Sequence, residues 1–111
     1  MDYCLDRREN AVVVAVKGRV DESSWEAFGA GLREAIGDAR QFGIGKVIID
    51  LCNLDYMSSR GLRVLTVARR ESDDVGITLL LAAPNEVMRE ILAISRYDKL
   101  FKVTETVDAA L

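Results

Sequence analysis

The chain contains no histidine, only one proline and only two cysteines among its 111 residues. The absence of histidine excludes hydrolases that rely on a Ser-His or Cys-His pair, and no Cys/His set for zinc can form. Cys4 and Cys52 make no CxxC pair, which suits a protein of a reducing compartment. We expect both cysteines to be small, buried hydrophobic residues. The sequence therefore predicts no metal site, no cofactor and no enzymatic activity.

Long apolar runs and an excess of basic charge are missing as well. No stretch of about 18 apolar residues occurs, and the segment that begins Met1-Asp2-Tyr3-Cys4 is unlike the apolar part of a secretory signal. The net charge of −3 gives no basic footprint for nucleic acid. We expect a cytoplasmic protein that neither inserts into membranes nor binds nucleic acid directly.

What is present is an alternation of strand and helix patterns over residues 1–111, which we expect to form one domain. Half of the residues are apolar, enough for a core. The patterns predict strands over 3–8, 11–17, 47–51, 77–82 and 101–104, and helices over 23–39, 58–71, 85–95 and 106–111. Strands that alternate with helices predict an α/β fold with a mixed, mostly parallel sheet of four to five strands and about four helices.

Two helix starts carry recognisable capping signals. Ser23 and Glu26 have the spacing of a capping box, and Asn85 is a good N-cap. In the first of these helices, Trp25 and Phe28 begin an apolar stripe and are expected in the core. Gly29 and Gly31 weaken that helix, and close packing against a neighbour is the expected reason.

Two adjacent serines, Ser58 and Ser59, stand where a buried strand gives way to a helix. The free N–H groups at such a helix start favour an anion. A simpler interpretation is that Ser58 is the N-cap and Ser59 fills the first turn. Gly61 keeps this turn uncluttered, so that another backbone can approach.

The order of features resembles the STAS domain family, and within it the bacterial anti-sigma factor antagonists. The resemblance covers nearly the whole length. It is carried by these segments: Gly18-x-x-Asp21, Asp50-Leu51, Leu54-Asp55-Tyr56-Met57-Ser58-Ser59-Arg60-Gly61-Leu62, Leu79-Leu80-Leu81, Pro84-Asn85, Ile91-Leu92 and Tyr97-Asp98-Lys99-Leu100-Phe101.

The resemblance implies a switch controlled by phosphorylation. In that family, a serine at this helix start is phosphorylated by a partner that is both a serine kinase and an anti-sigma factor. The unphosphorylated antagonist holds the partner and frees a sigma factor, and a serine phosphatase resets the switch. Aligned on Gly61-Leu62, the phosphoserine falls on Ser59, with Ser58 as the alternative. The family often has aspartate in place of Ser58, and usually a small residue in place of Arg60.

The expected docking surface comprises Asp21, Ser58, Ser59, Arg60, Gly61 and Arg63. The resemblance places Asp21 beside the phosphoserine, although a turn aspartate that bonds its own backbone is an equal alternative. Arg63 lies on a helix face with Ser59, Thr66 and Arg70, which suits an acidic partner but is also typical of a solvated side. Asp50 is expected at the end of its strand, where it orients the serine loop or accepts nearby N–H groups.

Two other functions remain open. One is an accessory STAS subunit that regulates the ATP-binding component of a membrane transport system without phosphorylation. The other is a hydrolase or nucleotidase, which the missing histidine and metal ligands disfavour. The turn Gly43-Ile44-Gly45-Lys46 lacks the spacing of a phosphate loop and precedes a strand.

Overall fold

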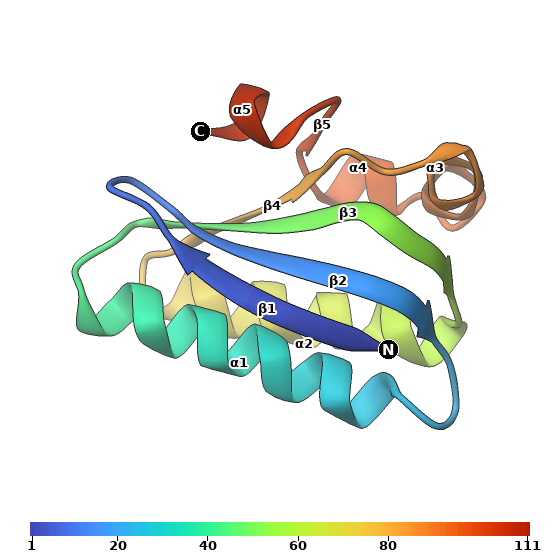
Figure 1. Cartoon of the computed structure of the whole chain (residues 1–111), viewed down its shortest axis with the longest axis horizontal. Helices are drawn as coiled ribbons and strands as arrows, with labels where there is room; N and C mark the ends of the chain where they lie inside the picture. The colour runs from blue at the N-terminus through green and yellow to red at the C-terminus, as the bar shows by residue number, and fades with distance from the viewer.

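The computed structural model describes residues 1–111 and shows a five-stranded sheet with helices on both faces (Figure 1). The strand order is β1-β2-β3-β4-β5; β1 pairs antiparallel with β2, and the other neighbours are parallel. The predicted α/β class with a mixed, mostly parallel sheet is confirmed. The elements are β1 (Asp2–Arg7), β2 (Val12–Val20), α1 (Trp25–Gln41), β3 (Lys46–Met57), α2 (Ser59–Asp74), β4 (Thr78–Ala82), α3 (Glu86–Ile94), α4 (Tyr97–Leu100), β5 (Val103–Thr104) and α5 (Val107–Ala110).

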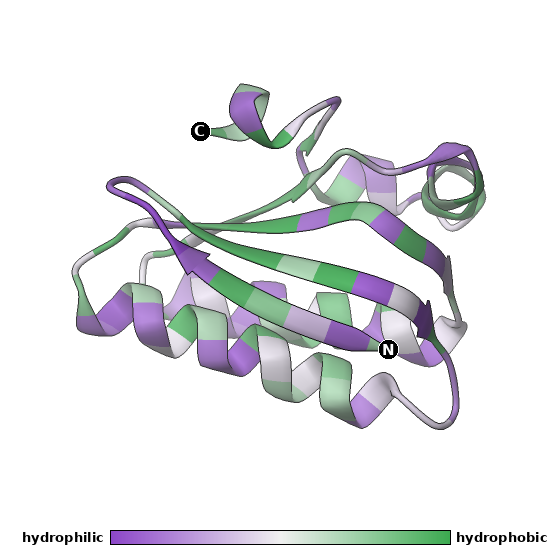
Figure 2. Cartoon of the chain, viewed as in Figure 1, coloured by the Kyte–Doolittle hydropathy of each residue, from purple (hydrophilic) through white to green (hydrophobic).

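The core lies mainly between the sheet and the helices α1 and α2, which run along one face (Figure 1). Alternate residues of β2 point to opposite faces, because side chains alternate along a strand. Val12 and Val14 enter the main core, whereas Val13 joins a smaller cluster with Ile48 and Ala110 of α5. Figure 2 shows the apolar stretches of β2 and β3. These stretches are continuous hydrophobic runs in the sequence because both faces of the sheet are covered there.

Both central strands are longer than the sequence predicts. β2 continues to Val20 and β3 to Met57, and the two stay paired through Gly18↔Leu54 and Val20↔Met57 after register shifts. Asp50 therefore lies inside β3, and its predicted place at a strand end is wrong. The extra pairing buries Leu54 and Met57 and carries the chain directly to the start of α2.

The predicted capping box at the start of α1 is wrong. Helix α1 begins at Trp25 with Ser24 as N-cap, and no side-chain cap bond is made there. The Ser24 hydroxyl instead donates to the Arg19 carbonyl at 2.8 Å and accepts the Asp21 N–H at 2.9 Å. Ser23 bonds the Asp21 carboxylate, so both serines stabilise the loop between β2 and α1.

Two further expectations concern burial. Cys4 and Cys52 are free and exposed, so the expectation that they are buried hydrophobes is wrong. Phe28 is buried as expected, whereas Trp25 is only partly buried at the edge of the core.

The short helix α4 is not among the predicted elements, so the chain has one helix more than the sequence predicts.

The expected close packing of the helix glycines is observed at Gly31. A Cβ there would lie 3.0 Å from ring atoms of Tyr3, which crosses over α1 from the edge strand β1. At Gly29 the packing is ordinary, since the atom nearest to an added Cβ lies 3.4 Å away on Arg33.

The start of α3 is as predicted: the Asn85 side chain accepts the Met88 N–H at 3.0 Å. None of the helices combines the length and hydropathy that a bilayer crossing requires.

Candidate docking site at the start of α2

The two serines occupy different positions at the junction of β3 and α2. Ser58 is the N-cap: its N–H donates to the Val20 carbonyl at 2.8 Å, and its hydroxyl accepts a long bond of 3.4 Å from the Gly61 N–H. Ser59 is the first helical residue; it is exposed, and its hydroxyl makes no hydrogen bond to the protein. The structure therefore leaves Ser59 as the accessible hydroxyl, while Ser58 is half-buried and engaged in the cap.

Gly61 is buried within the junction. A Cβ at this position would lie 2.5 Å from Met57 Cγ and 2.7 Å from Val20 Cγ1, closer than packed atoms allow. The first turn of α2 rests directly on the ends of β2 and β3 through this glycine. Gly61 thus positions Ser59, and the close approach expected from the sequence is made by the protein's own side chains.

Asp21 follows Val20, whose carbonyl holds Ser58, so the two loops lie side by side at this end of the sheet. Its carboxylate accepts the hydroxyl and N–H of Ser23 at 2.8 and 3.0 Å. These two bonds have the largest effect, and a hydrogen bond from the Ser24 hydroxyl adds to it; together they hold the pKa of Asp21 below its usual range. Asp21 is therefore ionised at neutral pH and has the self-bonded turn geometry, next to the serine junction.

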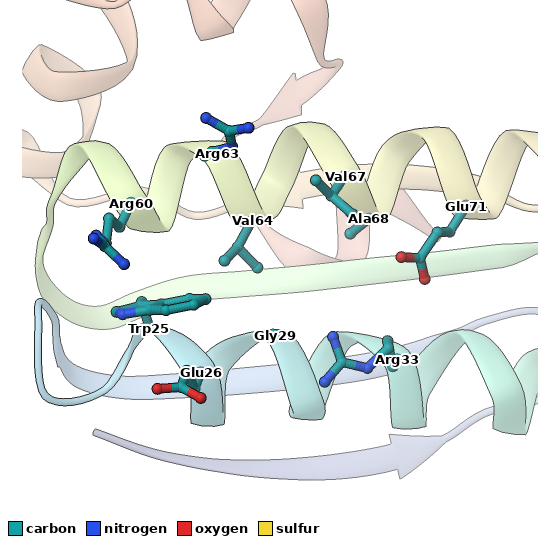
Figure 3. Close-up of a pocket in the computed structure, with 10 residues that line it drawn as sticks. All are labelled: Trp25, Glu26, Gly29, Arg33, Arg60, Arg63, Val64, Val67, Ala68 and Glu71. Atoms are coloured by element: carbon teal, nitrogen blue, oxygen red, sulfur yellow. The ribbon is translucent and has the colours of Figure 1, made fainter.

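Arg60 extends from α2 toward α1. Its Nε lies 3.4 Å from Glu22 Oε2, and its guanidinium carbon lies 5.2 Å from the centre of the Trp25 ring. Figure 3 shows Arg60 directed at Trp25, at one end of a groove of about 520 Å³ between the two helices. Val64 and Gly29 lie along the groove beyond this pair. The groove could not be predicted from the sequence. Helical spacing assigns Trp25 to the core, whereas in the structure Trp25 lines the groove.

Of the four side chains that helical spacing places on one face of α2, three are exposed and one is not. Ser59, Arg63 and Arg70 are exposed. Thr66 is half-buried, and its hydroxyl lies 2.7 Å from the hydroxyl of Tyr97 in α4. Thr66 therefore joins α2 to α4, and only the other three side chains on this face of α2 are free.

Asp50 does not take part in the serine junction. Its carboxylate accepts the Cys52 N–H at 3.1 Å within β3. Although Cys52 is exposed, partial desolvation, then a hydrogen bond to Asp50 and the negative charge of Asp50, raise the pKa of its thiol, which favours the thiol form. No group of three or more His, Cys, Asp or Glu side chains is placed to hold a metal ion.

The structure thus brings Asp21, Ser58, Ser59, Arg60 and Gly61 to one end of an α/β domain, with Arg63 one turn along α2. The candidate site is an exposed surface around a free serine hydroxyl, beside a shallow groove. The chain belongs to the STAS domain family, whose profile matches residues 4–110. This confirms the family that the sequence resembles.

Known proteins of similar sequence and fold fit this assignment. The chain is 27% identical over 110 residues to BtrV of Bordetella bronchiseptica, provisionally named an anti-sigma factor antagonist; the match covers 99% of this chain and 91% of that protein. The anti-sigma factor antagonist SpoIIAA in its unphosphorylated form superposes with a TM-score of 0.75 at 21% identity, covering 98% and 92% of the two chains. A sulfate transporter family protein from Wolinella succinogenes superposes with a TM-score of 0.76 at 14% identity, covering 94% and 84%.

Proposed function

We propose that this protein is an anti-sigma factor antagonist that acts by phosphorylation-controlled docking in the cytoplasm. Unphosphorylated, it binds an anti-sigma factor that is also a serine kinase, through the surface formed by Asp21, Ser58, Ser59, Arg60 and Arg63, which the buried Gly61 supports from below. Phosphorylation of Ser59 releases that partner, and a serine phosphatase restores docking. The protein itself catalyses no reaction in this cycle.

The observation that carries the proposal is the free, exposed hydroxyl of Ser59 at the first position of α2. A phosphate there adds about −1.5 to −2 charges at neutral pH. The helix start tolerates the charge, so the fold persists. A partner packed on the same surface would have to desolvate it, which is costly without a matching cation. The similarity to BtrV and SpoIIAA supports the proposed role as an anti-sigma factor antagonist. SpoIIAA of Bacillus, which shares this fold, also has a structure in its phosphorylated form.

We expect the cognate kinase and ATP to place one phosphate on this protein, at Ser59. The kinase is the one recovered with the protein from native cells, and peptide mapping by mass spectrometry locates the phosphate. Ser59→Ala should abolish the modification, whereas Ser58→Ala should leave it in place. A phosphate confined to Ser58 would move the site by one residue, and no phosphate on either serine would contradict the proposal.

The second candidate function is that of an accessory STAS subunit of a membrane transport system. The favouring observation is the fold shared with the Wolinella succinogenes transporter family protein. In that case an ATP-binding transport component, and no serine kinase, would accompany the protein in a pull-down from native cells. Intact-mass analysis of the same bait would show no phosphate.

Arg60 should tune docking without deciding it. Its contacts with Glu22 and Trp25 are made at the surface, and an exposed ion pair contributes less than about 1 kcal/mol. We therefore expect Arg60→Ala to change kinase affinity by no more than severalfold, with the difference shrinking at high salt. Calorimetry at two salt concentrations measures this. Complete loss of phosphorylation in a folded variant would instead make Arg60 a recognition anchor.

A further inference from the structure

The two arginines that follow Ser59 at the start of α2 have different surroundings. Arg60 is held by Glu22 and by the face of Trp25. Arg63 is exposed, makes no ion pair and lies over no aromatic ring, although it borders the same groove. Figure 3 shows Arg60 directed toward Trp25 and Arg63 directed away from it.

Helix geometry favours Arg63 as the neighbour of a group on Ser59. Residues four apart lie on the same face, one above the other, whereas adjacent residues point in different directions. An acid that precedes a base by four residues is also the better orientation of such a pair. Ser59 and Arg63 have this spacing and order, and Arg60 does not.

We propose that Arg63 is the residue that binds the phosphate of phosphorylated Ser59, while Arg60 stays on Trp25 and Glu22. The inference rests on the proposed function, because it concerns the phosphorylated form. A guanidinium matches phosphate geometry with two parallel hydrogen bonds, and Arg63 has no other partner to give up. Phosphorylation then changes the docking surface twice: it adds negative charge, and it occupies a cation that an acidic partner would otherwise meet.

The test uses protein that carries phosphoserine at position 59 by incorporation during translation, so that no kinase is needed. The second pKa of a phosphoserine is about 6, and phosphorus NMR follows it through a pH titration. Removing a bound arginine should raise this pKa by roughly half a unit, about a threefold change in the dissociation constant. The other charged groups at this end include Arg19, Asp21, Glu22 and Glu26, and they are the same in every variant.

We expect Arg63→Ala to raise the phosphate pKa by that amount, and Arg60→Ala to raise it clearly less. Arg70→Ala is the matched control, since it removes the same charge from the same face of α2, farther from Ser59. An equal or larger effect of Arg60→Ala, or none of Arg63→Ala, would overturn the assignment. A kinase that ignores Ser59 would count against the proposed function but would not alter this titration.

Trp25 provides a second readout, because it is the chain's only tryptophan. If Arg60 stays in place, the fluorescence response to phosphorylation should be the same in the wild type and in Arg60→Ala. A response that occurs in the wild type and disappears in Arg60→Ala would show that Arg60 leaves Trp25 for the phosphate. That result would also overturn the assignment.

Discussion

Gly61→Ala should lower the free energy of unfolding by about 1 to 3 kcal/mol, the usual cost of forcing extra volume into a packed site. The added methyl group would sit 2.5 Å from Met57 Cγ and 2.7 Å from Val20 Cγ1, and both side chains are buried. Val20 is β-branched and stiff, so it cannot turn aside freely. Relief requires that α2 move away from the strand ends, which would also displace Ser59.

Gly37→Ala is the matched control, because the chemical change is the same and the surroundings are empty. Gly37 lies on the exposed side of α1, and a methyl group added there would meet no atom within 4 Å. Alanine in an open helix position should stabilise by about 0.5 to 1 kcal/mol. Urea unfolding of the two variants should therefore shift in opposite directions. A Gly61→Ala protein as stable as the wild type would show that the junction is loosely packed.

Some of the structure that depends on local signals could be predicted from the sequence, although the capping box at Ser23 and Glu26 does not form. Asn85 and Ser58 are N-caps in the structure, because capping uses only the next three residues. The extension of β3 could not be predicted in this way. The segment from Cys52 to Tyr56 mixes polar and apolar residues, and it becomes a strand because β2 offers a partner alongside.

The candidate site was predictable to a similar extent. The serine pair, the glycine and their place at a strand-to-helix junction follow from the sequence and the family resemblance. The contacts of Arg60 do not, since Glu22 and Trp25 belong to a loop and helix start far away in the chain. Helical spacing put Trp25 on the core stripe, but at the first position of α1 it reaches only the edge of the core.

Ser59→Asp should weaken binding of the anti-sigma factor kinase about tenfold or more, equivalent to about 1.4 kcal/mol. A carboxylate at this exposed position would face the docked partner, which must desolvate it. The fold should persist, because a negative charge at a helix start changes stability by no more than about 1 kcal/mol. Isothermal calorimetry measures the affinity, and circular dichroism verifies the fold. Ser59→Ala removes the hydroxyl without adding charge and should bind like the wild type.

Ser58→Asp is the sharper control, since it places the same charge one residue earlier. Aspartate is a good N-cap, and the Ser58 side chain is already turned inward to the Gly61 N–H. Its carboxylate would be satisfied within the cap, so kinase affinity should fall by less than about threefold. If both aspartate variants weakened binding equally, general charge repulsion would explain the loss. If Ser59→Asp bound as tightly as the wild type, an electrostatic switch at this serine would be refuted.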